Sequence, residues 1–138
     1  MSDELRQILR RHSTSIAAHL AAELVKGSES RFQKIDSEVL SERCAMLVEA
    51  LVSSAWQGAD QLAQRVTTIA QQRFKEGFLL EDLQQALRIL EVDAWRIIAN
   101  ESDQDSVVTN LGTLTIAMGY ARDELARIAQ LYAFAPAS

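Results

Sequence analysis

The chain contains few of the residues that interrupt helices, with one proline and five glycines among its 138 residues. Sheets and loops need more of both, so this composition, with 48% hydrophobic residues, favours a compact all-α protein. Alternation of apolar and polar residues never persists, so we expect no strand. A chain of this length can bury a core without disulfides or a metal, and we expect one domain over residues 1–138.

Several other features are scarce, and each absence excludes a class of protein. Cys44 is the only cysteine and lies in an apolar helical pattern, so we expect a buried thiol in a reducing cytoplasm rather than a nucleophile. The formal net charge of −5 provides no basic surface for nucleic acid. The longest uncharged stretch, residues 106–121, is shorter than the roughly 20 apolar residues that a bilayer requires. Met1–Arg11 is charged from Asp3 onward, so we expect neither a membrane span nor an export signal.

The sequence also lacks the residue patterns of a catalytic or metal site. Its two histidines, His12 and His19, are seven positions apart, and no histidine follows them. Haem or a metal ion would need further ligands from other elements, so we expect no metal and no cofactor. The hydroxyl run Ser13-Thr14-Ser15 has no acidic or basic constellation that would make a nucleophile, and no glycine-rich phosphate loop occurs. We therefore expect no enzyme.

Apolar residues spaced by three and four positions predict a five-helix bundle with a long C-terminal helix. Ile35 can pack on Leu40 across the start of the second helix, and Asp105 follows the expected cap of the fifth by three positions, as in a capping box. We expect the first helix from Ser2 to about Val25 and the second from its N-cap Asp36 to Gly58. The third contains Leu62 and stops at Gly77, and the fourth contains Leu83 and ends near Asn100. The fifth runs from its N-cap Ser102 to Tyr132.

The last helix carries an apolar seam with spacings of four and three, which is typical of a coiled coil or of a helix packed lengthwise in a bundle. A second face has a small residue every seven positions, along which another backbone could approach closely. The pattern fits internal packing as well as pairing. We expect a homodimer in which Leu125 and Ile128, which charged residues flank, face the partner more than Leu111 and Leu114 do. The seam contains Leu111, Leu114, Met118, Leu125, Ile128 and Tyr132, and the small residues are Gly112, Gly119, Ala126 and Ala133.

The segment RFKEGFLLEDLQQALRIL, residues 73–90, is followed by Ala-Trp-Arg at 94–96. An aromatic residue ends one helix, a glycine turns the chain, a leucine-rich helix follows, and an Ala-Leu-Arg run leads to a tryptophan. In these features the chain resembles the N-terminal regulatory domain of the RsbR/RsbRD group, the RsbT co-antagonist proteins of bacterial stress-signalling complexes. The matching residues are Phe74, Gly77, Leu83, Ala86, Leu87, Arg88 and Trp95.

This resemblance implies a globin-like or bundle-like sensory module without haem. Such modules are usually dimeric and pass a signal through their last helix to an output domain. The chain departs from the pattern at Leu80, where a capping Ser, Thr or Asp is expected. The start of the fourth helix therefore has no recognisable cap in the sequence.

Large apolar side chains between helices are the candidates for lining a ligand site, because such sites form between the helices of bundles. We predict a pocket lined by Phe74, Phe78, Leu87, Trp95 and Met118, with plain core packing of the same residues as the alternative. A buried Trp95 would need a partner for its indole N–H. Two functions follow as hypotheses: a sensory or regulatory input domain of bacterial signal transduction, with an output or kinase protein as partner, or a helical dimerisation module without a small-molecule ligand.

Overall fold

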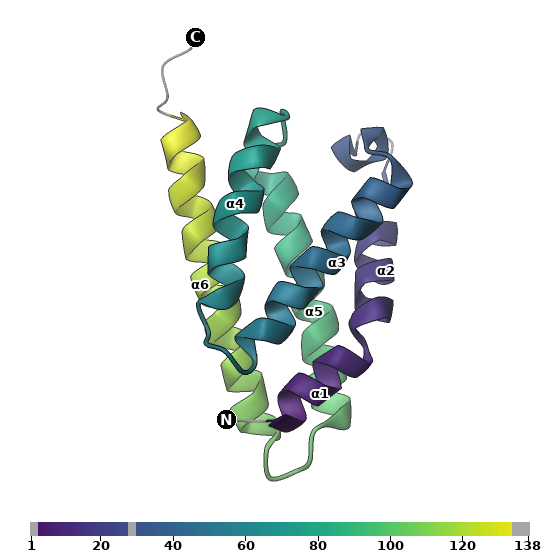
Figure 1. Cartoon of the computed structure of the whole chain (residues 1–138), viewed down its shortest axis with the longest axis vertical. Helices are drawn as coiled ribbons and strands as arrows, with labels where there is room; N and C mark the ends of the chain where they lie inside the picture. Colours follow the sequence, from purple (N-terminus) through teal and green to yellow (C-terminus); the bar gives the residue numbers. More distant parts are fainter. Residues whose placement is uncertain (1–2, 28–29, 134–138) are drawn as a thin grey trace.

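The computed structural model describes residues 3–27 and 30–133, and within these ranges all regular structure is helical (Figure 1). The predicted all-α class and the long C-terminal helix are confirmed. None of the helices in the two ranges is long and apolar enough to cross a membrane. The elements are α1 (Asp3–Arg11), α2 (Ser13–Leu24), the 3-10 helix η1 (Arg31–Lys34), α3 (Ser37–Ser54), α4 (Gln61–Lys75), α5 (Leu80–Glu101) and α6 (Val107–Ala133).

The first predicted helix is two helices, α1 and α2, so the described part of the chain has six α-helices rather than five. The break falls at His12, whose backbone has φ −104° and ψ 6°. Ser13 Oγ donates to the carbonyl of Arg10 at 2.8 Å, and Ser15 Oγ donates to the carbonyl of His12 at 3.0 Å. Serine hydroxyls at such positions compete with helical hydrogen bonds and favour a bend. The two helices therefore take different directions (Figure 1).

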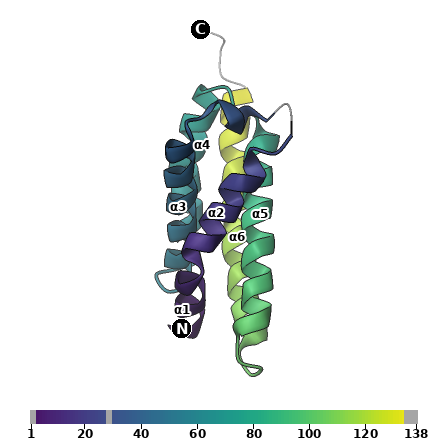
Figure 2. The same ribbon diagram turned by 90° about the vertical axis from the view of Figure 1, so that its right-hand side faces the viewer.

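The helices pack around one apolar core. Figures 1 and 2 show α4 and α6 side by side in the same direction, with α5 antiparallel beside α6. α2 packs against α3 and α5, and α1 meets α3 and α5 at one end of the bundle. α3 and α4 are close at the turn that joins them and diverge toward their other ends (Figure 1). Each α-helix contributes to the core, for example through Leu9, Leu20, Leu47, Leu62, Leu90 and Met118.

An aspartate side chain caps the start of α3, and a serine side chain of α3 accepts a hydrogen bond from the first turn of α4. Asp36 caps α3 as expected, because its carboxylate accepts the backbone N–H groups of Glu38 at 2.9 Å and Val39 at 3.3 Å. Asp60 stands at the N-cap of α4, but its side chain makes no capping bond and instead accepts from Gln64 Nε2 at 2.9 Å. Ser54 of α3 instead accepts the backbone N–H of Leu62 at 2.8 Å in a buried position. This bond satisfies one of the free N–H groups in the first turn of α4.

Gly77 ends α4 as predicted, with φ +99°. The N–H of Phe78 donates to the carbonyl of Arg73 at 3.0 Å, and the N–H of Gly77 donates to the carbonyl of Phe74 at 3.1 Å. These two bonds form a Schellman motif, which needs a left-handed residue at the glycine position. The motif turns the chain from α4 into α5.

α5 begins at Leu80, although no capping side chain precedes it. The backbone N–H of Leu79 donates to the carboxylate of Asp82 at 2.8 Å. This bond is one half of a capping box, supplied by the third residue of the helix rather than by the cap. It explains how the helix starts without a capping Ser, Thr or Asp at Leu80.

The last helix begins later than expected. α5 continues to Glu101 and α6 begins at Val107, so Ser102 is the C-cap of α5 and not the N-cap of α6. Its backbone N–H donates to the carbonyl of Ile98 at 3.0 Å. The predicted capping box of Ser102 and Asp105 is therefore wrong.

The carboxylate of Glu4 in α1 holds the loop between α5 and α6. It accepts hydrogen bonds from Ser106 Oγ at 2.9 Å, from Asn110 Nδ2 at 3.0 Å and from the backbone N–H of Asp103 at 3.2 Å. These bonds, that of Ser106 first, hold the pKa of Glu4 below its ordinary value. The contact joins residues about a hundred positions apart, so no local spacing rule could reveal it.

The apolar seam of α6 is buried within the chain, against α4 and α5. Leu125 is 2% exposed and Ile128 is 1% exposed, so the expectation that they face a second copy is wrong. Spacing of four and three describes any lengthwise helix contact, and here the partners are two helices of the same chain. Leu114 and Met118 are also buried, and Leu111 and Tyr132 are partly buried.

Candidate functional site: an apolar groove between α3 and α4

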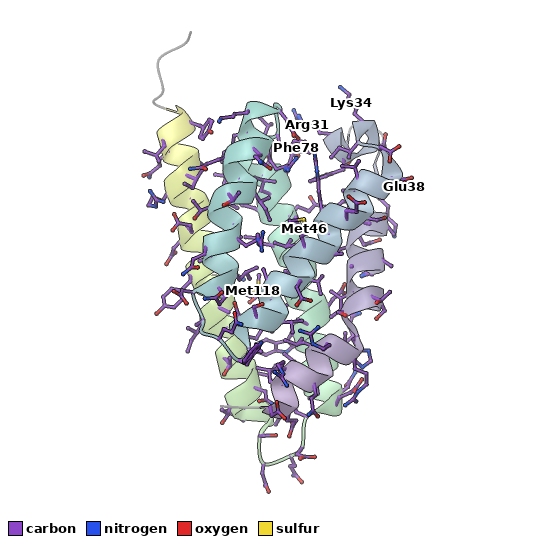
Figure 3. All side chains as sticks on the ribbon, viewed as in Figure 1. Arg31, Lys34, Glu38, Met46, Phe78 and Met118 are labelled. Carbon is purple, nitrogen blue, oxygen red and sulfur yellow. The ribbon has the colours of Figure 1, made fainter. Side chains whose placement is uncertain are left out.

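An apolar groove lies where α3 and α4 diverge. Its volume is about 400 Å³, within the range of small-molecule sites. α3 and α4 form its walls, α2 and α5 its floor, and η1 one end. Met46 lies on the wall of α3, toward the centre of the molecule (Figure 3). Leucines dominate the lining, with Leu20, Leu24, Leu40, Leu47 and Leu83 beside Ala86.

The closed end of the groove is formed by η1 and the corner between α4 and α5. The rings of Phe32 and Phe78 pack with their centroids 4.8 Å apart. Arg31 pairs with Asp82, with 3.3 Å between Nη1 and Oδ2. Figure 3 shows Arg31 and Phe78 close together at this end. Phe32 itself lines the groove, so this ring contact closes one end of the cavity.

Three arginines stand along the groove, Arg43 on α3 and Arg65 and Arg73 on α4. Glu76 accepts hydrogen bonds from Arg73 Nη1 at 2.7 Å and from Arg43 Nη1 at 3.3 Å. One carboxylate is therefore shared between two guanidinium groups. Arg65 forms no hydrogen bond or ion pair within residues 3–27 and 30–133.

Arg73 is the most unusual of the three because its side chain is only 9% exposed. Its Nη2 donates to Gln72 Oε1 at 3.1 Å, and its Nη1 donates to Glu76. The buried Nε–H has no hydrogen-bond partner among the described residues. Protein atoms cover Nε, so a group bound in the groove would meet the outer Nη1 and Nη2 of Arg73 rather than this donor.

Cys44 lies in the wall of the groove and is buried, as expected. Burial raises the pKa of its thiol to about 11, because desolvation disfavours the thiolate. The thiol is therefore neutral at pH 7. A neutral thiol is a poor nucleophile and a poor metal ligand, so Cys44 contributes an apolar surface to the wall.

None of the five residues predicted to form a pocket lines this groove. Leu87 and Met118 are buried in the core, and Phe78 contacts the groove only at its closed end. Phe74 lies on the side of α4 that meets α6. Trp95 is 45% exposed, so the expectation of a buried indole is wrong. Helical spacing identified apolar residues but not which side of each helix meets a cavity.

Sequence reasoning missed the arginines of the groove, because arginine on an amphipathic helix normally faces solvent. One signal was available. Val66, Ala70 and Arg73 follow the spacing of a buried helical face, and the first two are buried. Arg73 therefore occupies a core position of α4, which its charge alone would not suggest.

The two histidines each pair with a carboxylate of α5 and not with each other. His19 Nδ1 lies 2.6 Å from Oδ2 of the buried Asp93, and His12 pairs with Glu101. These contacts attach the N-terminal helices to α5. No group of three or more potential metal ligands occurs in the part of the chain that the structure describes.

The small residues of α6 are not used for close packing within the chain. A side chain added at Gly112 or Gly119 would meet nothing within 4 Å. Ala126 is exposed, and the side chain of Ala133 lies outside the described residues. This face of α6 is therefore open to solvent rather than in contact with a neighbouring helix.

Three comparisons with known proteins identify no relative. No family model matches the chain, and no curated protein or solved structure is similar to it at a significant level. The class that the structure defines is an all-α bundle with an apolar groove beside a buried arginine.

Proposed function

We propose that this chain is a regulatory input domain that binds a small molecule in the groove between α3 and α4. The observation that carries the proposal is a groove of about 400 Å³ with a largely apolar lining and a buried arginine, Arg73, in its wall. The resemblance of residues 73–96 to the RsbR/RsbRD domains supports a place in a bacterial stress or signal-transduction system. In that setting the protein acts in the cytoplasm and has an output or kinase protein as partner.

α4 is the element that can connect the groove with α6. Arg73 and Gln72 line the groove, whereas Gln71 and Phe74 contact α6. Tyr132, in the last turn of α6, donates from Oη to the carbonyl of Gln71 at 3.1 Å. Its ring packs on that of Phe74 with 5.4 Å between centroids. A ligand that binds better to one position of α4 would therefore shift the end of α6 as well.

A thermal-shift screen of small apolar and amphipathic compounds tests this proposal. A compound that binds only the folded chain raises its melting temperature by mass action. Ala86→Leu fills the floor of the groove and should abolish the shift. Ala99→Leu makes the same change on the same helix at an exposed position, and should preserve it. If no compound shifts the melting temperature, or if both variants respond equally, the groove is not the binding site.

The alternative is a dimerisation module without a ligand, with a homodimer formed through α5 and α6. Its support is the exposure of large apolar residues on these neighbouring helices, namely Val92, Trp95 and Val108, which is 80% exposed. Trp95→Lys should then convert a dimer into a folded monomer. A wild type that is monomeric by light scattering at micromolar concentration would contradict this alternative.

A further inference from the structure

We propose that the groove binds a small amphipathic anion, whose carboxylate pairs with Arg73 and whose apolar chain lies along the leucines of the floor. This inference rests on the proposed function, because it names the class of ligand for the same groove. It extends that function by assigning a role to the charged residues, which an apolar pocket alone would not need.

The charges around the groove favour an anion. Arg43, Arg65, Arg73 and Glu42 line it, and Glu76 pairs with two of the arginines from its edge. Three positive and two negative side chains leave one positive charge unbalanced. A cation would meet this surplus in a partly desolvated site, where charge repulsion is strong. A carboxylate would instead neutralise it.

The hydrogen bonds of Arg73 indicate where the carboxylate would bind. A guanidinium has five N–H donors in a planar fork and no acceptor. Glu76 accepts one N–H of Nη1 and Gln72 accepts one N–H of Nη2, so among residues 3–27 and 30–133 each Nη keeps a second N–H without an acceptor, and the covered Nε–H has none either. Carboxylate oxygens match this fork and form short, charge-assisted bonds with it. A ligand carboxylate would accept hydrogen bonds from the remaining N–H groups of Nη1 and Nη2.

The remaining lining suits an unbranched apolar chain. Leu20, Leu24 and Leu83 provide a floor without charges, and Met46 and Val39 lie at the exposed edge of α3. Methionine has a flexible side chain that adapts to irregular apolar ligands. The head of the ligand would lie near Arg73, beside the closed end, and its tail would extend along the groove toward Met46.

Three probes with the same chain and different head groups test the inference: decanoate and decylammonium, each below its micelle concentration, and decanol below its solubility limit. We expect titration calorimetry to detect decanoate bound to the wild type, weaker binding of decanol, and no binding of decylammonium. Arg73→Gln should weaken decanoate binding at least about tenfold, the effect of losing a charged hydrogen bond, and leave decanol unchanged. Arg88→Gln is the matched control, since Arg88 is exposed on α5 and does not line the groove.

The outcomes separate this inference from the proposed function. If decanol binds as tightly as decanoate and Arg73→Gln has no effect on binding, the preference for an anion is refuted, while the groove remains a ligand site. If decanoate binds equally to Ala86→Leu, it binds elsewhere and the inference is refuted. If no probe binds to the wild type, the inference is refuted, and the thermal-shift screen described above decides separately whether the groove has a ligand. Should Arg73→Gln not fold, the comparison of head groups on the wild type still decides.

Discussion

Leu125→Ala distinguishes a seam that packs within the chain from one that pairs two chains. Leu125 is buried among α4, α5 and α6, so the change leaves a cavity in the core. Truncation of a fully buried leucine costs about 3 kcal/mol, and up to about 5 kcal/mol where the site cannot collapse. This is a large share of the roughly 5–15 kcal/mol that stabilises an ordinary domain. For a chain of this size the melting temperature should fall by about 10 °C.

The matched control is Leu131→Ala, six positions further along α6, where the side chain is 56% exposed. It makes the same change in helix propensity and should alter the free energy of unfolding by no more than about 0.5 kcal/mol. Urea unfolding followed by circular dichroism measures both variants, with light scattering to record their mass. Equal stabilities of the two variants, together with loss of a dimer in Leu125→Ala alone, would show that the seam faces a second copy after all.

Three further changes test the contacts that define the helix ends. Gly77→Ala should lower the free energy of unfolding by about 1–2 kcal/mol, because Gly77 has φ +99°. Gly112→Ala, at an open helical position, should raise it by about 0.5–1 kcal/mol. Denaturant unfolding in which both variants change the free energy of unfolding in the same direction would refute the left-handed turn. Ser54→Ala leaves the buried N–H of Leu62 without its acceptor and should lower the free energy of unfolding by about 1–3 kcal/mol in the same assay. A decrease below about 0.5 kcal/mol would mean that water replaces the hydroxyl. The pKa of Glu4 is lowered in the folded chain, so its carboxylate stabilises the fold above the ordinary pKa of 4.5, and this contribution disappears as pH falls through the folded pKa. The difference in stability between wild type and Glu4→Gln should therefore shrink from pH 7 to pH 3. A difference that does not depend on pH would contradict the contact.

The features of the fold that depend on a few neighbouring residues could be predicted from the sequence. Asp36 caps α3, and Gly77 ends α4, because each acts on groups within a turn of its own position. The break at His12 was missed because apolar spacing continues through it, and only the serine hydroxyls favour the bend. The start of α6 was missed because Glu4 fixes it from the opposite end of the sequence.

The candidate site was less predictable than the fold. The groove exists because α3 and α4 diverge at an angle, and residues of α2, α5 and η1 complete its lining. No pattern within α3 or α4 encodes that angle. Arg73 could have been recognised by its core position in the helical repeat, yet nothing in the sequence shows that its Nε lacks an acceptor. Two of the aromatic residues that suggested a pocket instead pack in pairs, Phe74 with Tyr132 and Phe78 with Phe32, and the third, Trp95, is exposed.

Hydrogen exchange with and without a bound compound tests most directly whether occupation of the groove reaches α6. The compound would be the tightest binder from the library screen, so the measurement does not depend on the head group. We predict altered exchange in residues 37–47 and 65–75, which flank the groove, and also in the last turns of α6, which do not line it. Tyr132→Ala should abolish only the change in α6, because it removes the contacts with Gln71 and Phe74. A change confined to the helices of the groove would contradict signalling through α6, and no change in those helices would contradict binding in the groove.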